Sequence, residues 1–494
     1  MTIDHCTNGK TPPYSTMNIV AFWVFGVFTG LMILSSLYDF VWDYFEIRPK
    51  PILLAFSVLT NGKRLFSINT KRSPNNIDCL TAIRVISMIW IMNHHMYSNN
   101  FIPSINQNEF FSWINTFISM PATMAQVVVD SFFFIGGLLV AWIGFRDLDR
   151  SNGKINIVMN IVHRYIRLTP VLAAGMLTIY GIYDILYTGP FRDLALGQSK
   201  CNSYNWWPVL IYIHNYYVQD TKCYDETWYL AVDFQLYVLS PLLLIPMWKW
   251  GKKVVYVVIA LIIAAIAWVM AVFFMKGFTA MSVGGNDGEW ELTYTPMHTR
   301  CGSWLIGFIL GYFMHKNRQT KFHLPRIVQF LAWIACFVTF AAIIFGPYPT
   351  LHAHSQGTVF EAAMYEGLKR VSWAIALSWI TFACHYGFGG VVDTCLSHPF
   401  WQPFGRLTYA LYLMHMGVIR MHFGMFRTTK YFSTYTMFLG FWGAFGVTLL
   451  VAIYMTLAFE APILILEKFI FGDGKKNDKK PPAVVQSTHP QKEV

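Results

Sequence analysis

The most informative part of the chain is an apolar segment with two widely spaced ionisable side chains: Thr81-Ala-Ile-Arg-Val-Ile-Ser-Met-Ile-Trp-Ile-Met-Asn-His-His-Met-Tyr97. Arg84 and His95 are eleven residues apart, which on an α-helix is about three turns and roughly 16 Å. One helix face therefore carries a cation near the membrane surface and an imidazole deeper in. Ionisable groups in membrane spans are costly and usually face the protein interior. The segment predicts a membrane helix that carries part of a functional site.

The composition is that of an integral membrane protein. Of 494 residues, 55% are hydrophobic and only 13% are charged, whereas soluble domains carry about a quarter charged residues. We predict an all-α, polytopic fold of about eleven transmembrane helices, with one extra N-terminal helix before a ten-helix core. The predicted spans cover residues 17–39, 82–99, 123–145, 158–186, 228–248, 254–275, 299–315, 326–346, 366–385, 407–424 and 434–458.

Lysine and arginine residues are concentrated in alternate loops, which sets the expected orientation. Residues 100–122 and 347–365 contain neither residue type. We therefore expect a multi-pass protein of the endoplasmic reticulum or plasma membrane, with the N-terminus outside or in the lumen and the C-terminus in the cytosol. The net charge of +11 follows from the basic loops, which face anionic membrane lipids. No nucleic-acid partner is expected.

Four regions are expected along the chain. They are a short extracellular or lumenal N-terminus (1–16), the first span with a basic cytosolic loop (17–78), the ten-helix core (79–465) and a charged, disordered cytosolic tail (466–494). Cys201 and Cys223 share one outer loop in an oxidising compartment, so we expect a disulfide between them. No spacing of histidine and cysteine residues indicates a metal site.

Arg164 and Arg167 open the fourth predicted span. They are three residues apart and so lie on one helix face, and guanidinium groups bind phosphate oxygens bidentately. Together with Arg84 at the same membrane surface, they are candidates for an anion site that binds the phosphates of an acyl donor such as acyl-CoA. The simpler alternative for each arginine is an anchor at the membrane interface.

Asp130 and Asp233 are carboxylates inside predicted spans, where each must be paired, neutralised or hydrated. Asp130 and His95 fall at a similar predicted depth, and a carboxylate beside an imidazole makes it a better general base. The simpler alternative for His95 is a hydrogen-bonded packing histidine. The adjacent His94 points about 100° away, so only one of the two shares the side of Arg84, and the spacing favours His95.

The remaining polar residues at span ends are interpreted as structural. They are Arg300, Arg370, Arg406 and His415, together with Glu460, which is expected to mark the cytosolic end of the last span. Gly307 and Gly311 are four residues apart, which predicts close packing between two helices.

Six motifs occur in one order and together carry a family resemblance. They are Cys79-Leu-Thr-Ala-Ile-Arg84, His95 separated from Arg84 by ten residues, Asp130-Ser-Phe-Phe-Phe-Ile-Gly-Gly137, Arg164-Tyr-Ile-Arg-Leu-Thr-Pro170, Trp228-Tyr-Leu-Ala-Val-Asp-Phe-Gln-Leu-Tyr237 and Arg406-Leu-Thr-Tyr-Ala-Leu-Tyr-Leu-Met-His415. Over about residues 45–468 the chain resembles the membrane acyltransferase-3 family, most closely its animal nose-resistant-to-fluoxetine branch.

The resemblance implies a ten-helix acyltransferase core. It implies that His95, in an Arg-x10-His motif, is catalytic and that Arg164 and Arg167, in an Arg-x-x-Arg motif, bind the acyl donor. The implied reaction moves an acyl group, often acetyl, from cytosolic acyl-CoA to a hydroxyl of a lipid or carbohydrate acceptor, with acyl-CoA as co-substrate and no bound cofactor. We take Asp130 and Asp233 as further catalytic candidates and Arg84 as a further substrate-binding candidate.

A lipid or small-molecule carrier, or an inactive member of the family, is the alternative function. Two departures from the family pattern bear on this choice. The chain has Gly136-Gly137 where the family usually has Ser-Gly, so one hydroxyl is missing. About sixteen residues precede the first predicted span, so the large cysteine-rich domain common in the branch is not expected here.

Overall fold

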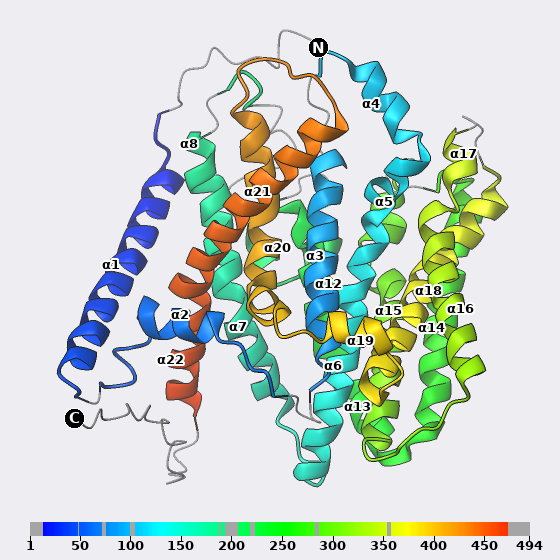
Figure 1. The fold of residues 1–494 in the computed structure, drawn as a ribbon, viewed down its shortest axis with the longest axis horizontal. Coiled ribbons are helices and arrows are strands. Elements are labelled where there is room, and N and C mark those ends of the chain that lie inside the picture. Colours follow the sequence, from blue (N-terminus) through cyan, green and yellow to red (C-terminus); the bar gives the residue numbers. More distant parts are fainter. Residues whose placement is uncertain are drawn as a thin grey trace, which may run out of the picture.

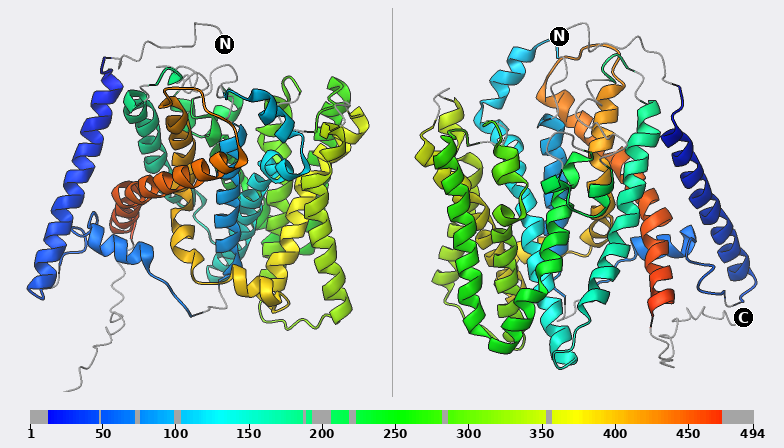
Figure 2. Two further views of the ribbon diagram at one scale, coloured as in Figure 1. Left: turned by 45° about the horizontal axis from the view of Figure 1, so that its top comes forward. Right: turned by 180° about the vertical axis from the view of Figure 1, so that it is seen from behind.

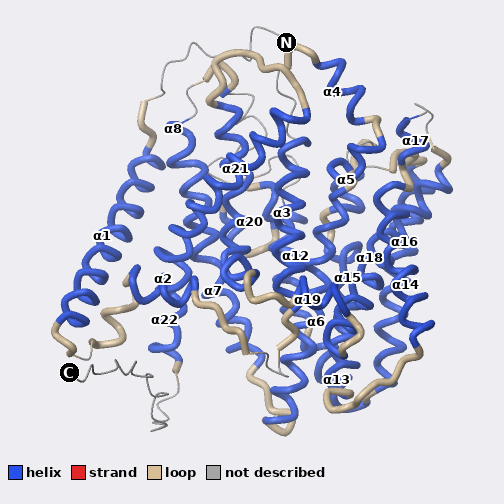
Figure 3. Tube along the Cα trace, viewed as in Figure 1, coloured by secondary structure: helices blue, strands red, loops and turns tan. Residues whose placement is uncertain are grey.

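The computed structural model describes residues 13–47, 49–71, 76–98, 104–186, 189–192, 206–217, 223–281, 286–352 and 357–472. These residues form a bundle of helices (Figures 1 and 3), with one isolated bridge between Ser104 and Lys430. No β-strand occurs among them. The predicted all-α fold is confirmed.

Ten long helices make the bundle. They are α1 (Thr16–Tyr44), α3 (Cys79–Ser98), α6 (Val129–Arg150), α7 (Ile157–Leu177), α14 (Lys252–Lys276), α15 (Met297–Lys316), α16 (Arg326–Phe345), α18 (Val359–Tyr386), α20 (Trp401–Gly424) and α21 (Thr434–Met455). Four shorter elements extend this set: α12 (Trp228–Leu239) leads into α13 (Pro241–Trp250), and α21 continues through the π-helical turn η7 (Thr456–Glu460) into α22 (Ala461–Phe471).

Short helices and turns connect the bundle. They are α2 (Val58–Phe66), α4 (Gln107–Ile114), η2 (Phe117–Ser119), α5 (Met120–Thr123), η3 (Ala125–Val128), η4 (Thr178–Tyr183), α8 (Asp184–Leu186), α10 (Trp207–Leu210), α11 (His214–Tyr217), η5 (Asp225–Thr227), η6 (Trp290–Tyr294), α17 (Tyr348–His352) and α19 (Gly390–Leu396).

Local sequence signals fix several helix ends. Ser15 and Thr358 form capping boxes at the starts of α1 and α18, so their side chains accept hydrogen bonds from otherwise unpaired backbone N–H groups. Gly277 and Gly387 end α14 and α18 with φ angles of 68° and 85°. Glycine adopts this left-handed conformation without the steric cost that other residues pay.

Helices occupy all eleven places where spans are predicted, but not all of them pass as membrane spans. Within the described residues, seven helices are long and apolar enough to cross a membrane, or eight if the bent pair of α18 and α19 is one span. The predicted count of eleven is therefore not confirmed. The helix α18 passes only together with α19, and the three helices that fall short in either case are α3, α15 and α20, which carry charged and polar side chains.

These three helices lie inside the bundle rather than against lipid. More than half of the residues in each of α3, α15 and α20 are buried. In α1 and α16, only 17% of the most apolar window is buried, and Figures 1 and 2 show α1 at one edge of the bundle. Helices that other helices shield from lipid need fewer apolar side chains. A criterion based on hydropathy alone therefore does not identify them as membrane spans.

The helices α6 and α15 pack backbone against backbone. A Cβ atom added to Gly137 would lie 1.9 Å from the carbonyl oxygen of Trp304, and one added to Gly307 would lie 2.0 Å from the carbonyl oxygen of Phe134. Gly311, one turn further along α15, is similarly crowded. The close packing predicted from the two glycines of α15 is confirmed.

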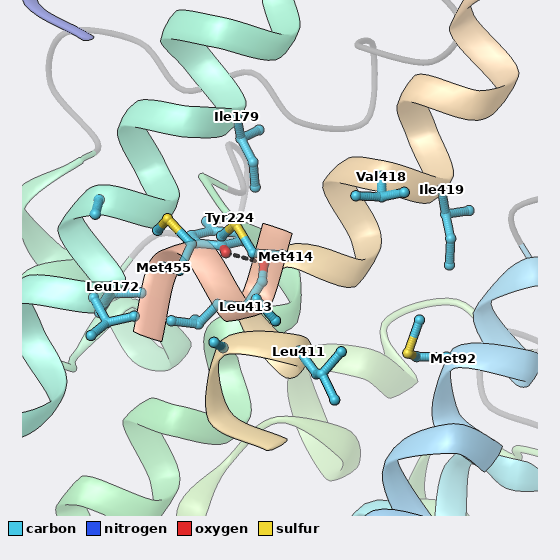
Figure 4. Close-up of a cluster of buried hydrophobic side chains, with 14 of the residues drawn as sticks. Met92, Leu172, Ile179, Tyr224, Leu411, Leu413, Met414, Val418, Ile419 and Met455 are labelled. Carbon is cyan, nitrogen blue, oxygen red and sulfur yellow. Dashed lines mark hydrogen bonds between the residues drawn. The ribbon is translucent and has the colours of Figure 1, made fainter. Parts of the chain in front are cut away.

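A hydrophobic core joins α7, α20 and α21 (Figure 4), where Leu172, Met414 and Met455 surround Tyr224. The Tyr224 hydroxyl donates a hydrogen bond to the backbone carbonyl of Leu413 in α20. Because Tyr224 directly precedes η5, this contact fixes the start of α12 beside α20.

The peripheral elements are tied to the bundle by polar contacts. Asn18 of α1 donates a 2.8 Å hydrogen bond to the carbonyl oxygen of Gly181 in η4. Arg406 of α20 donates 2.7 Å bonds to the carbonyl oxygens of Leu65 and Ser67 at the end of α2. These contacts support the structural interpretation of Arg406.

Basic residues gather at the end of the bundle where α6 and α13 end and α7 and α14 begin, at the bottom of Figure 1. We call this the basic end, defined by Arg146, Arg150, Lys154, Lys249, Lys252 and Lys253. It is the predicted cytosolic end, and the orientation in a membrane stays a prediction.

Two further expectations concern residues that the structure does not describe. Cys223 takes part in a disulfide, but Cys201 lies outside the described residues, so their pairing stays a prediction. The charged tail beyond Gly472 also lies outside them.

Candidate active site

A cavity of about 870 Å³ lies between α3, α6, α7, α12 and α20. It is near the upper end of the range for ligand pockets, about 300–1,000 Å³. Along α3 its wall extends from Arg84 to Ser98, a distance of roughly 21 Å at the rise of an α-helix. Asp147 and Asn160 line it near the basic end. The cavity therefore extends along much of the bundle.

Five of the six predicted site residues lie in the wall of this cavity. They are Arg84, His95, Arg164, Arg167 and Asp233, from α3, α7 and α12. The helix geometry that placed Arg84 and His95 on one face thus brings both into one cavity. Their chemical roles stay predictions.

The arginines cluster with a carboxylate. Arg164 pairs with Asp233 through an Nη2 to Oδ2 hydrogen bond, and its guanidinium carbon lies 4.2 Å from the centre of the Tyr237 ring. Arg84 interacts electrostatically with Arg167 and Asp233. Asp233 is therefore the counter-ion of the arginine cluster.

Glu460 lines the cavity, contrary to its predicted place at the cytosolic end of the last span. It is only 9% exposed and interacts electrostatically with Arg167, and its Oε2 has no hydrogen-bond partner among the described residues. The expectation that Glu460 marks the end of the last span is wrong, because the helical chain continues through η7 and α22 to Phe471. Proline is tolerated in the first turn of a helix, so Pro462 does not stop it.

His95 lies in a row of three histidines, with ring centroids 5.3 Å from those of both His94 and His415. The Nδ1 of His94 lies 2.6 Å from the carbonyl oxygen of Ala122, and that of His415 lies 2.5 Å from the carbonyl oxygen of Tyr412. Backbone contacts thus orient the outer two rings. His95 is half-buried in the cavity wall. Among the described residues, no group of three His, Cys, Asp or Glu side chains is placed to hold a metal ion.

The predicted pairing of Asp130 with His95 is wrong. Asp130 is fully buried, and its Oδ2 accepts a 2.7 Å hydrogen bond from Nη1 of Arg300 while its Oδ1 accepts a 2.9 Å bond from Ser303. It does not line the cavity, whereas the preceding residue, Val129, does. Each residue along an α-helix turns the side-chain direction by about 100°. Asp130 and His95 share a predicted depth in the membrane, but the Asp130 side chain points away from the cavity.

Asp130 belongs instead to a second group of charges, which we call the sealed cluster: Asp130, Arg300, Glu366, Lys369 and Arg370. Its members are at most 6% exposed, and none lines the cavity. Lys369 pairs with Glu366, and Arg370 lies 3.9 Å from Glu366. The structural interpretation of Arg300 and Arg370 agrees with this arrangement.

A second ion pair lies in the cavity wall, and neither of its residues is among the predicted site residues. Nη2 of Arg420 lies 3.7 Å from Oε2 of Glu226, and the residues are 6% and 7% exposed. Arg420 falls inside the predicted span 407–424, so the argument applied to Arg84 would have identified it. Glu226 lies in a turn before α12, and no sequence pattern marks it.

The missing hydroxyl of the family pattern falls beside the arginine cluster. A Cβ atom added to Gly136 would lie 3.1 Å from Oδ1 of Asp233. A serine at this position would thus bring its hydroxyl close to the carboxylate that pairs with Arg164.

The helical bundle and its apolar helices define a polytopic membrane protein with a charged internal cavity. A family profile described as an acyltransferase domain matches residues 77–457. The chain belongs to this acyltransferase-3 family.

Three relatives extend this finding. The chain is 28% identical to nose resistant to fluoxetine protein 6 of Caenorhabditis elegans, over 86% of the chain and 54% of the relative. It is 24% identical to regulator of hypoxia-inducible factor 1 of the same organism, over 74% of each chain. It is 22% identical to peptidoglycan O-acetyltransferase OatA of Listeria monocytogenes, over 71% of the chain and 50% of the relative.

The chain thus spans about half the length of the first and third of these relatives. No solved structure matches it.

Proposed function

We propose that this protein is a membrane O-acyltransferase that moves an acyl group from acyl-CoA to a hydroxyl of a lipid or carbohydrate acceptor. The observation that carries the proposal is the shared cavity, which has an arginine cluster toward the basic end and His95 roughly 16 Å away along α3. A donor with phosphates at one end and a thioester at the other matches this separation of charge and imidazole.

In the proposed reaction, Arg164 and Arg167, with Arg84 nearby, bind the phosphates of the donor. The His95 imidazole takes the proton of the acceptor hydroxyl, and the resulting oxygen nucleophile attacks the thioester carbonyl. The C–S bond then breaks, and the CoA thiolate takes the proton from the imidazolium. The products are an ester and free CoA.

The role proposed for Asp233 differs from the catalytic role predicted from the sequence. Its carboxylate contacts Arg164 and not His95, which supports a positioning role. It holds the guanidinium in place before a donor arrives, and phosphate oxygens replace it as partners when the donor binds. Asp130 has no proposed part in the chemistry.

A carrier is the second candidate, and the length of the cavity favours it. A cavity lined from Arg84 to Ser98 would also suit a protein that moves an amphiphile along the bundle without chemistry. The two candidates differ in whether a thioester is consumed.

The test is the loss of thioester from acetyl-CoA and palmitoyl-CoA, with purified protein and candidate hydroxyl acceptors. A proton-transfer residue contributes about 10²–10⁴-fold in rate, so we expect His95→Ala to lower turnover by that factor with unchanged folding. His422→Ala is the matched control, because His422 is on α20 but does not line the cavity. Turnover that survives in His95→Ala would remove the role of His95, and saturable binding without turnover would favour the carrier.

A further inference from the structure

The helix α6 has a single face that is not covered by protein. Between Ser131 and Phe145, the residues that are not buried are Phe132, Gly136, Leu139, Val140, Ile143 and Gly144. Their spacing of three and four residues puts them in one stripe along the helix. All six line the cavity, so this exposed face of α6 is cavity wall.

The stripe is apolar throughout. None of its six residues has a polar side-chain atom, and it is roughly 18 Å long at 1.5 Å per residue. The polar residues Asp130 and Ser131 on the same helix are buried away from the cavity. An apolar wall inside a cavity that also holds charged side chains is unfavourable to hydrate and favourable to cover with hydrocarbon.

Two glycines keep the stripe open. A Cβ atom on Gly144 would lie 3.0 Å from both methyl carbons of Leu244 on α13, and one on Gly136 would lie 3.1 Å from Asp233. Larger side chains at these positions would narrow the space in front of α6.

The walls around the stripe enclose it near the basic end. Aliphatic side chains from three other elements line the same cavity there: Ile161 of α7, Leu244 and Ile245 of α13, and Leu464 of α22. A surface bounded by three other elements differs from the outer face of a helix such as α16, which is largely exposed.

We propose that this stripe binds a long hydrocarbon chain of one substrate. An acetyl group would cover only a small part of an apolar wall roughly 18 Å long, whereas an alkyl chain would cover most of it. The chain belongs either to a long-chain acyl donor or to a lipid acceptor. The proposal rests on the acyltransferase function for the identity of the substrate, but not for the binding of the chain.

The first experiment measures binding as a function of chain length in two arms. One arm titrates acyl-CoAs from acetyl to palmitoyl, and the other titrates 1-alkanols over the same lengths, with protein in lipid nanodiscs and empty nanodiscs subtracted. Each buried methylene should strengthen binding about fourfold until the stripe is covered. Dependence in the acyl-CoA arm assigns the chain to the donor, and dependence in the alkanol arm alone assigns it to the acceptor.

The second experiment blocks the stripe. Ile143→Trp fills the cavity at a residue that is already 42% exposed, so the fold should tolerate it. We expect tenfold or greater loss for palmitoyl-CoA or hexadecanol and less than twofold change for acetyl-CoA. Leu331→Trp is the matched control on the exposed face of α16, where the residue is 56% exposed. If Ile143→Trp does not fold, Val140→Phe is used in its place to block the stripe.

The outcomes separate this proposal from the proposed function. Binding that is independent of chain length in both arms, or equal effects of Ile143→Trp and Leu331→Trp, would overturn the hydrocarbon site. Absence of any acyl-CoA binding and turnover, with alkanol binding that still depends on chain length and on Ile143, would overturn the acyltransferase while keeping the site.

Discussion

The cavity wall and the sealed cluster both hold buried charges inside one helical bundle, but they use them differently. In the sealed cluster, Asp130 is fully buried, is bound to Arg300 and Ser303, and does not line the cavity. In the cavity wall, Arg164 and Asp233 pair with each other and still border a space of about 870 Å³. A charge inside a membrane span therefore indicates a function only when it also faces room for a ligand.

The largest expected effect breaks the sealed cluster. Arg300→Ala leaves the carboxylate of Asp130 buried without its cation, and such a loss costs about 3–5 kcal/mol. We expect a large drop in the midpoint of thermal unfolding and in the monodisperse fraction on size-exclusion chromatography. The double variant Asp130→Asn with Arg300→Ala should recover part of the loss. A wild-type midpoint for Arg300→Ala would contradict the distinction between the two groups.

Removing an arginine from the cavity wall should weaken binding of the acyl donor without changing the stability of the fold. Arg167 is exposed, so Arg167→Ala should leave the unfolding midpoint unchanged. A hydrogen bond to a charged group contributes about 1.5–3 kcal/mol, which predicts a donor affinity roughly 10- to 100-fold weaker. Equilibrium binding of acetyl-CoA checks this value. Arg326→Ala removes an exposed cation outside the cavity and should change neither quantity.

The adjacent residues Gly136 and Gly137 test the same contrast between packed interior and cavity wall, with smaller expected effects. Gly137 faces α15, where an added Cβ atom meets the Trp304 carbonyl oxygen at 1.9 Å. Gly137→Ala should force α6 and α15 apart and cost about 1–3 kcal/mol, as overpacking of a tight core does. Gly26→Ala in α1 is the control, because no atom lies within 4 Å of its added Cβ. Equal midpoints for the two variants would contradict the close packing.

The smallest effect is expected at Gly136, which is adjacent to Gly137 and lines the cavity. Gly136→Ser restores the residue usual in the family, and its Cβ atom, 3.1 Å from Oδ1 of Asp233, requires only a small shift of that side chain. The unfolding free energy should stay within about 0.5 kcal/mol of the wild type, as thermal unfolding will show. Gly136→Val adds bulk without a hydroxyl, so a change in donor affinity seen with serine alone would assign that change to the hydrogen bond.

Much of the fold was predictable because hydropathy and basic loops reflect the membrane directly. The number of spans was not, since α3, α15 and α20 are screened from lipid and tolerate polar residues that lower their hydropathy. Their places along the chain were still correct. The family was predictable from six ordered motifs, and the match over residues 77–457 confirms it.

Site residues were predictable where the relative positions of two side chains depend on one helix alone. They were not predictable where a contact depends on how two helices pack together. The spacing of Arg84 and His95 depends only on the helical repeat, and both line the cavity. Asp130 failed because depth in the membrane gives the height of a side chain but not its direction around the helix. Glu226 lies in a turn whose position depends on tertiary contacts, which no local pattern records.

The anchoring of Glu226 places a disulfide beside the cavity wall. The backbone carbonyl of Glu226 accepts a hydrogen bond from Tyr412, and Tyr224 binds the Leu413 carbonyl on the same helix. Cys223, next to Tyr224, takes part in a disulfide. The turn that carries the Glu226–Arg420 pair is therefore held from two sides, by hydrogen bonds to α20 and by a disulfide three residues before Glu226.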